Sequence, residues 1–463
     1  MAILRKGVPV AKTSQRGTLK GEPLGGAFFW LSVFYVVYCV RPEDWIPGLG
    51  YLPLAKISTV LALLALLMSV ARSKRRFVDL PREAFYFLAI ILLLFISAFL
   101  SPVWKGGAFY GTLDFGKAFI AWVLTFLVIT SFARLKRIIF LQSASVAVIT
   151  LVSVLKGSSH PRLEGVIGGI YSNPNDLAFA IVLCLPFCFA FLLSTRSLAR
   201  KAAWGMSMLV MCAALFMTAS RGGFITLLVT GAVCLWVFGI KGKRVHLIAA
   251  AAVVVMMLAA VGGGRLKDRF FAISENNVNN GLEESAHDSY EERRQMIFQS
   301  IQVVARYPWG IGLGNFAVYS GTWHDVHVAY LQIAAEGGIV TLVLYLLFFA
   351  RGFHNLRQRR RTPSDDPEIE MFSGALYATL IGFIVGAFFA PEAYQYFPYF
   401  AVAYTSVLFA IAREKELSEI SAADPQTPST RERRAGGFTP FRGGPSSRIP
   451  SLRTPNALFR NWR

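Results

Sequence analysis

Arginine, asparagine and histidine residues stand at the ends of apolar runs in this chain, where they could bind a phosphate and move a proton. Arg221 lies between two apolar runs with almost no polar loop to solvate it. A guanidinium group at that depth either snorkels to the membrane interface or pairs with an anion, a protein carboxylate or a lipid phosphate. Because its fork binds phosphate oxygens bidentately, Arg221 suits a diphosphate held at the membrane surface.

His327 ends a polar loop and directly precedes an apolar run that contains Glu336. An imidazole titrates near neutrality and suits a general base for a hydroxyl group, although a single interfacial histidine is more often structural. His324 and Asp325 are too few to complete a metal site with it, so we predict none. Glu336 would lie about 180° around a regular helix from His327, and we expect it to cap, to pair with an arginine, or to hold the Gly337-Gly338 turn.

The segment Asn173-Pro-Asn175-Asp176 precedes another apolar run. Its ordinary interpretation is a turn followed by a helix N-cap, because Asn and Asp side chains accept hydrogen bonds from the free N–H groups of a first helical turn. The same segment follows His160, Arg162 and Glu164. It is therefore also a candidate for contacts with a polar ligand.

The elements that must position these residues are membrane helices. Apolar residues make up 54% of the chain and charged residues 16%, and the mean hydropathy is +0.49. A soluble protein would need more charge to cover its surface. We predict an all-α polytopic membrane protein with about twelve spans, each long enough to cross the hydrocarbon core. The predicted spans are 25–40, 54–71, 84–100, 115–133, 136–155, 175–193, 202–219, 223–240, 246–262, 326–350, 372–390 and 396–412.

Lys and Arg residues set the orientation, because they collect in alternate segments when the N-terminus is placed inside. We expect a cytoplasmic N-terminus (1–24) that leads into a retained signal anchor, nine spans (25–262), a long periplasmic loop (263–325), three spans (326–412) and a disordered basic cytoplasmic tail (413–463). The net charge of +20 lies in cytoplasmic segments, where topology and anionic lipid account for it, so nucleic-acid binding is not expected. The five cysteines fall in apolar runs and form no disulfide or metal pattern.

This topology brings polar residues of three segments to one outer face. The first runs from His160 to Ala178, the second is the hairpin Ser220-Arg221-Gly222-Gly223, and the third is the long loop that ends at His327. Within that loop, spacing predicts a helix from Ser285 to Arg306. A lipid headgroup would lie at this surface.

At these residues the chain resembles the O-antigen ligase and polymerase superfamily, membrane glycosyltransferases of the bacterial envelope. The family has an outer glycine–asparagine–proline–asparagine motif, matched by Gly168 to Ala178, and a serine–arginine–glycine hairpin, matched at Ser220. It then has an arginine in a loop helix, a proline–glycine–glycine motif, and a histidine–tyrosine–leucine–glutamate–glycine stretch. Residues 293–337 match these in order, but Val328 replaces the asparagine that usually follows the histidine.

The resemblance implies a GT-C-like fold at the bacterial inner membrane and a metal-independent, inverting transfer without cofactor. The donor would be a glycan on polyprenyl (undecaprenyl) diphosphate, and the acceptor lipid A-core or another glycan or protein. We assign catalysis to His327, Arg221 and Arg293, with Arg293 and Arg294 left open as the diphosphate contact. Expected substrate-binding residues are Arg294, Arg306, Asn173, Asn175, Tyr330 and Arg162. Expected structural neighbours are Glu336, Gly310 and Gly312.

Three other functions compete with a ligase. A polymerase would join lipid-linked repeat units and shares the same motifs, and we favour a ligase because the long loop ends close to the histidine span. A secondary transporter also has about twelve spans, but it usually shows internal repeats and broken helices near the midplane, which this sequence does not. A non-catalytic envelope scaffold would not need this cluster of arginines and histidine.

Overall fold

The computed structural model describes residues 24–423, apart from 158–161, 164, 166–170, 172, 243, 245, 248, 250–280, 322–325 and 362–365. Within these residues the chain is helical and has no strand. The N-terminal segment 1–23, most of the predicted span 246–262, His160, His324, Asp325 and the tail from 424 lie outside the described residues.

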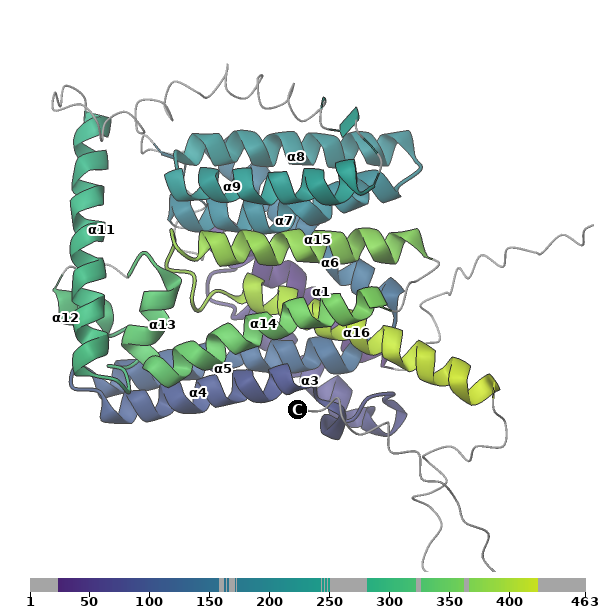
Figure 1. Ribbon diagram of the computed structural model, residues 1–463, viewed down its shortest axis with the longest axis horizontal. Coiled ribbons are helices and arrows are strands. Elements are labelled where there is room, and N and C mark those ends of the chain that lie inside the picture. The colour runs from purple at the N-terminus through teal and green to yellow at the C-terminus, as the bar shows by residue number, and fades with distance from the viewer. Residues whose placement is uncertain are drawn as a thin grey trace, which may run out of the picture. The chain divides into compact units, whose positions relative to one another are not determined.

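The helices follow the apolar runs (Figure 1). Their bounds are α1 Gly25–Val40, α2 Pro42–Trp45, α3 Leu54–Met68, α4 Arg82–Leu100, α5 Lys105–Val128, α6 Phe132–Lys156, α7 Pro174–Ser194, α8 Leu198–Thr218, α9 Arg221–Cys234, α11 Gly281–Arg306, α12 Phe316–Ser320, α13 Ala329–Gly337, α14 Ile339–Arg361, α15 Pro367–Gly386 and α16 Tyr396–Ala423. A π-helical turn, Leu235–Ile240, continues α9. Short 3-10 turns lie at Val70–Arg72 and Phe77–Asp79.

Among the described residues, nine helices are long and apolar enough to cross a membrane. The spans are 25–45, 82–100, 105–128, 132–156, 174–194, 198–218, 221–240, 339–360 and 367–386, and α3 is a shorter apolar helix. The all-α membrane architecture is therefore confirmed. The count of about twelve spans and the periplasmic position of the long loop stay predictions.

Local sequence signals explain where several helices begin. Pro174 and Pro367 occupy first-turn positions of α7 and α15, where their missing N–H costs nothing. Ser131 and Asp366 cap α6 and α15 by accepting hydrogen bonds from backbone N–H groups. The predicted helix from Ser285 to Arg306 is confirmed as part of α11.

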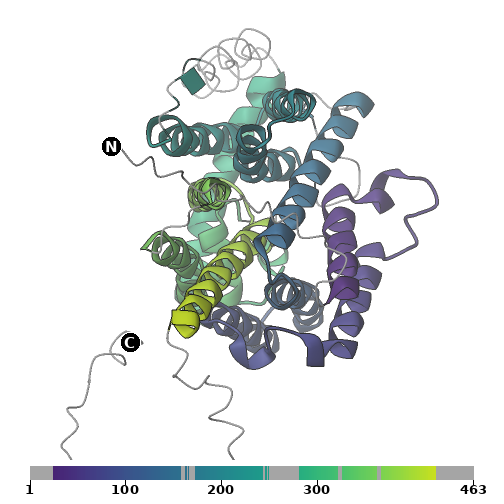
Figure 2. The same ribbon diagram turned by 90° about the vertical axis from the view of Figure 1, so that its right-hand side faces the viewer.

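Helix α7 lies at the centre of the bundle and contacts α6, α8, α9 and α15. In its most apolar stretch 78% of the residues are buried, a larger share than in any other described span. Helix α1 packs against α3, α5 and α6 on a different side from α8 and α9, as Figure 2 shows end-on. Because α7 is enclosed on several sides, its first turn has a fixed position relative to the hairpin between α8 and α9.

Two predictions about helix continuity were wrong. The expected span 326–350 is two helices, α13 and α14, because Gly338 adopts a left-handed φ of +89° and ends α13. The tail was expected to be disordered from 413, yet α16 continues to Ala423. Residues 413–423 are mostly strong helix formers, and Lys415 pairs with Glu419 one turn later at 3.7 Å.

Candidate active site

The first turn of α7 joins two of the predicted outer segments. Asn173 caps the helix, because its Oδ1 accepts a hydrogen bond from the backbone N–H of Asn175 at 2.9 Å. The N-cap interpretation of this asparagine is confirmed. The buried Asn175 side chain accepts two further hydrogen bonds, from Ser220 Oγ at 2.7 Å and from Arg162 Nη2 at 3.4 Å. The asparagine motif and the Ser220 hairpin are thus one hydrogen-bonded unit.

The hairpin between α8 and α9 presents Arg221 on this unit. Ser220 Oγ also accepts from the N–H of Gly223 at 3.1 Å and so caps α9. The Nε of Arg162 donates to the carbonyl oxygen of Thr218 at 3.0 Å. Arg221 is the first residue of α9 and is partly buried. The backbone that carries the Arg221 side chain is therefore fixed by several hydrogen bonds.

A glycine-rich loop between α11 and α12 packs on the end of α13. The N–H groups of Ile311 and Gly312 donate to the carbonyl oxygens of Ala335 and Glu336 at 3.0 and 2.9 Å. The Glu336 side chain is fully buried and its Oε1 accepts from the N–H of Gly314 at 3.0 Å. Glu336 thus holds this loop against α13, a structural role that differs from the three expected for it.

Glycine is required in this loop for two reasons. Gly310 and Gly312 adopt φ values of +85° and +94°, which side chains with a Cβ rarely adopt. A Cβ on Gly310 would meet the carbonyl oxygen of Glu336, and one on Gly312 would lie 2.6 Å from the Cβ of Ala108. The proline–glycine–glycine motif therefore permits close backbone approach.

His327 directly precedes α13 and is partly buried. Its neighbours Val326 and Val328 pack in a small apolar cluster with Met296 of α11 and Ile311 of the glycine loop. Val328 occupies the N-cap position of α13 and makes no side-chain cap. An asparagine here, which the family usually has, could accept a first-turn hydrogen bond, whereas the valine contributes apolar packing instead.

The arginines of α11 differ in exposure. Arg293 is partly buried and lies on the helix face that carries the buried residues Met296 and Ser300. Arg294 is 61% exposed and lies 4.0 Å from Glu291. Arg306 is exposed at the far end of the helix, with its guanidinium group 5.5 Å from the ring centre of Tyr307. Of these residues, only Arg293 lies on the packed face of α11.

Tyr330 anchors α13 to the end of α15. Its hydroxyl donates to the carbonyl oxygen of Ile384 at 2.8 Å, and its ring centre lies 4.8 Å from that of Phe388. Burial raises the pKa of Tyr330 to about 12. The hydroxyl therefore stays protonated at neutral pH and serves as a hydrogen-bond donor in this contact.

Sequence reasoning missed the segment 387–395 that joins α15 to α16, here named the connector. The connector lies beside α13 at the left of Figure 1. It contacts both halves of the site. Ala387 accepts a hydrogen bond from the N–H of Ala329 at 2.8 Å, and the Tyr394 side chain lies near that of Glu336. The connector also contacts the hairpin between α8 and α9, because its Phe389 packs on Gly222. A Cβ added to Gly222 would lie only 2.6 Å from the Cβ of Phe389.

Glu392 is the most unusual residue of the connector. It is only 3% exposed, and its carboxyl group shares a hydrogen bond with that of Asp176 in the first turn of α7. Burial, and then the charge of Asp176, raise the pKa of Glu392 well above its ordinary value. Glu392 is a charged residue between two apolar runs, as Arg221 is. The criterion that singled out Arg221 in the sequence would therefore also have singled out Glu392.

The predicted substrate-binding and structural residues thus fall into two connected groups and two outliers. Arg162, Asn173 and Asn175 meet at the Ser220 hairpin. Glu336, Gly310, Gly312 and Tyr330 meet at α13. Arg294 lies beside Glu291, and the guanidinium group of Arg306 lies over the ring of Tyr307. Across the part of the chain that the structure describes, no three metal-ligating side chains cluster.

A comparison with protein families supports the resemblance to O-antigen ligases. Residues 206–346 match the family model described as O-antigen ligase. The matched stretch contains Arg221, Arg293, the glycine loop, His327 and Glu336. No curated protein matches the chain. Over residues 206–346, this helical membrane chain is therefore similar to the O-antigen ligase and polymerase superfamily.

Proposed function

We propose that this protein is an O-antigen ligase-type glycosyltransferase of the bacterial inner membrane. It moves a glycan from undecaprenyl diphosphate to an acceptor hydroxyl of lipid A-core, or of another envelope glycan or protein. Both termini are cytoplasmic and the reaction takes place at the periplasmic face. The observation that carries the proposal is the family match over residues 206–346, which includes both candidate arginines and the candidate base.

On the donor side, negative charge develops on the diphosphate as it leaves the anomeric carbon. Cations that are already oriented stabilise this charge without a reorganisation cost during the reaction. We assign this role to Arg221 and Arg293. The hydrogen-bonded turn that begins α9 supports Arg221 in this role, and the packed face of α11 supports Arg293.

On the acceptor side, a hydroxyl oxygen attacks the anomeric carbon as the bond from that carbon to the diphosphate oxygen breaks. The hydroxyl proton passes to His327, and the configuration at the anomeric carbon inverts. No metal and no nucleotide sugar take part. The apolar cluster around Val326 and Val328 supports a fixed backbone position for His327.

A strain that lacks this protein, beside one that carries His327→Ala, tests the proposal. Surface glycan and carrier-linked glycan are compared on gels, with protein levels measured in the membrane fraction. A ligase predicts full-length polymer left on the carrier and unmodified acceptor in both strains. Normal transfer by His327→Ala at normal protein level would refute the base assignment.

The same gel separates the alternatives. Acceptor that carries only single repeat units would identify a polymerase that joins lipid-linked units. Unchanged glycan in both strains would overturn the glycosyltransferase proposal and return attention to a transporter. Arg221→Lys tests the donor side: an ammonium group cannot reproduce the fork of a guanidinium, so we expect about 100-fold slower transfer. A fully active lysine variant would favour simple snorkelling.

A further inference from the structure

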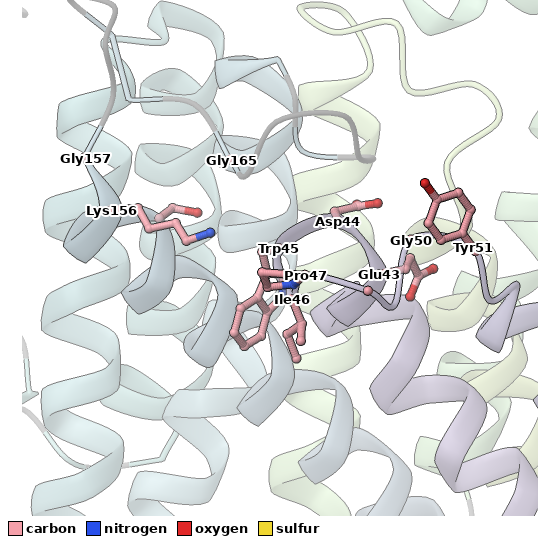
Figure 3. A pocket seen from close by; sticks show the side chains of 12 residues that line it. Glu43, Asp44, Trp45, Ile46, Pro47, Gly50, Tyr51, Lys156, Gly157 and Gly165 are labelled. Carbon is pink, nitrogen blue, oxygen red and sulfur yellow. The ribbon is translucent and has the colours of Figure 1, made fainter.

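A cavity of about 800 Å³ lies beside the corner between α1 and α2, and its lining residues are different from those of the groups described above. Its walls come from residues 43–51 and from the end of α6, where Ser153 and Lys156 line it. Figure 3 shows Trp45 within this wall and the Lys156 amine pointing toward it. Tyr51 stands at the cavity with 95% of its surface exposed. This volume is in the range of small-molecule sites in proteins.

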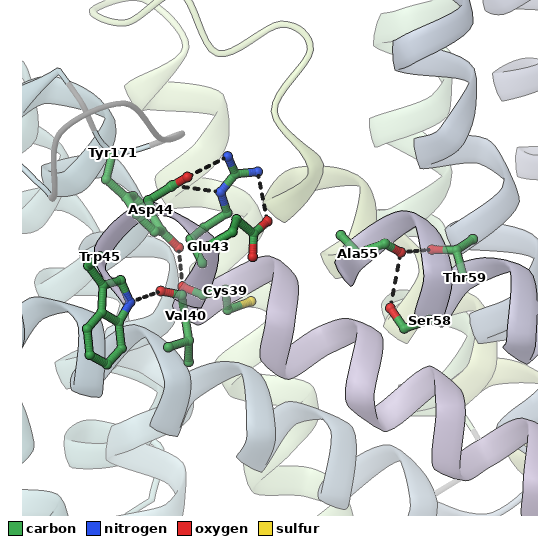
Figure 4. Close-up of polar contacts among 10 residues, drawn as sticks. Cys39, Val40, Glu43, Asp44, Trp45, Ala55, Ser58, Thr59 and Tyr171 are labelled. Atoms are coloured by element: carbon green, nitrogen blue, oxygen red, sulfur yellow. Dashed lines mark hydrogen bonds and ion pairs between the residues drawn. The ribbon is translucent and has the colours of Figure 1, made fainter. Parts of the chain in front are cut away.

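The corner that forms the cavity is held rigidly. The Arg41 guanidinium group donates to both carboxylate oxygens of Asp44, at 2.9 and 3.1 Å, and lies 3.7 Å from Glu43 (Figure 4). Trp45 Nε1 donates to the carbonyl oxygen of Val40 at 3.0 Å. The cavity wall is therefore preorganised, which lowers the entropy cost of binding.

The charges around the cavity balance. Of the residues that line the cavity, Glu43 and Asp44 are acidic and Lys156 is basic. Arg41 does not line the cavity, but it pairs with both carboxylates and so brings the net charge around it to zero. A diphosphate or a cation would prefer a wall with an excess of the opposite charge. The Glu43 carboxylate lines the cavity and its Oε1 atom lies 3.7 Å from an Arg41 nitrogen, so this wall offers a hydrogen-bond acceptor to a ligand.

Tyr171, which precedes α7, and Tyr396, the first residue of α16, connect this corner to the candidate active site. Tyr171, just before Asn173, donates its hydroxyl hydrogen to the carbonyl oxygen of Cys39 at 2.9 Å. Tyr38 stacks on Tyr396, the first residue after the connector, with ring centres 4.7 Å apart. The cavity and the candidate active site are therefore at the same end of the bundle.

We propose that this cavity binds the sugar units of a glycan substrate, at a distance from the diphosphate. Trp45 and Tyr51 offer aromatic faces for the C–H face of a pyranose ring, while Glu43 and Lys156 accept and donate hydrogen bonds with hydroxyl groups. The balanced charge suits a neutral, hydroxyl-rich ligand. This inference rests on the proposed function, because the sugar would belong either to the donor glycan or to the acceptor glycan.

Ligand-detected NMR on the full-length protein in nanodiscs tests the inference. One probe is the oligosaccharide released by mild acid from the carrier lipid of the host, and the second is the oligosaccharide released from its acceptor lipid. We expect Tyr51→Ala to weaken binding of one probe about tenfold and Glu43→Gln about fivefold. Binding by the wild-type protein is expected to change little between low and high salt, because the ligand is neutral.

Tyr110→Ala is the matched control, because Tyr110 is 71% exposed on α5 and lies outside the cavity. The probe that depends on Tyr51 identifies the sugar as donor or acceptor. Absence of binding to the wild-type protein, equal binding by all variants, or loss of binding at high salt would overturn the inference. Binding of both probes is measured without turnover, so a failure of the proposed transfer reaction and a failure of this cavity to bind sugar give different results.

Discussion

The Oε1 atom of Glu336 accepts a hydrogen bond from the backbone N–H of Gly314 at 3.0 Å, and a second donor, the N–H of Phe316, lies at 3.4 Å. Gly314 belongs to the glycine loop and Phe316 begins α12, whereas Glu336 belongs to α13. A buried side chain thus satisfies backbone groups that would otherwise be left without a partner. This relationship ties the position of the glycine loop to the helix that His327 precedes.

Replacement of Glu336 by alanine should destabilise the protein strongly. The substitution leaves the N–H of the buried Phe316 without this acceptor and removes the hydrogen bond from Gly314. A buried donor without a partner costs about 1–3 kcal/mol. We expect a clear fall in the unfolding temperature of the purified protein in detergent, and a smaller fall for Glu336→Gln, whose amide oxygen still accepts. The exposed Glu291 provides the control, since Glu291→Ala should leave the unfolding temperature unchanged. An unaltered unfolding temperature for Glu336→Ala would contradict this role.

Gly310 and Gly314 form a matched pair that separates two costs of adding a side chain. Both have left-handed φ values, +85° and +75°. A Cβ on Gly310 would meet the backbone of Glu336, whereas one on Gly314 meets nothing within 4 Å. We expect Gly314→Ala to cost about 1 kcal/mol from backbone conformation alone, and Gly310→Ala to cost more in the same thermal unfolding experiment. Equal effects would mean that the loop moves to admit the methyl group.

Local features of the site could be predicted from the sequence, and contacts between distant segments could not. The cap at Asn173 depends on residues within one turn, so its interpretation needed only the local pattern. Apolar runs likewise located α4 and α7 to within two residues, because membrane helices must be long and apolar. The hydrogen bond between Asp176 and Glu392 joins residues far apart in the chain, and no local pattern indicates that pairing.

The break between α13 and α14 at Gly338 shows a second limit of prediction from the sequence. An apolar run from 326 to 350 predicts one helix, because hydropathy does not distinguish a continuous helix from two that are joined by a tight turn. The break follows from a tertiary contact: an added Cβ on Gly338 would lie 2.7 Å from the carbonyl carbon of Trp309 in the glycine loop. Only the folded arrangement shows why the chain changes direction there.

Glu392 should make stability depend on pH. Its raised pKa means that the folded protein holds this proton more tightly than the unfolded chain does. The stabilisation is complete below the ordinary glutamate pKa, about 4.3, and is lost as the pH rises toward the raised value. We expect the unfolding temperature of the wild-type protein to fall more steeply from pH 5 to pH 8 than that of Glu392→Gln. Parallel pH profiles for the two proteins would show that Glu392 has no shifted proton affinity.

Arg293 and Arg294 are adjacent in the sequence but differ in exposure, which makes them a sharp test of the donor side. Arg293 is partly buried on the packed face of α11, and Arg294 is 61% exposed beside Glu291. If Arg293 stabilises the leaving diphosphate, Arg293→Ala should slow transfer about 100-fold or more.

For Arg294→Ala we expect less than about a twofold change, because an exposed ion pair contributes little energy. The measurement is the amount of polymer joined to acceptor in strains with equal levels of each variant. Arg293→Lys adds a further distinction, since it keeps the charge but loses the planar fork and should recover only part of the activity. A larger loss for Arg294→Ala than for Arg293→Ala would reverse the assignment and place the diphosphate on the exposed face of α11.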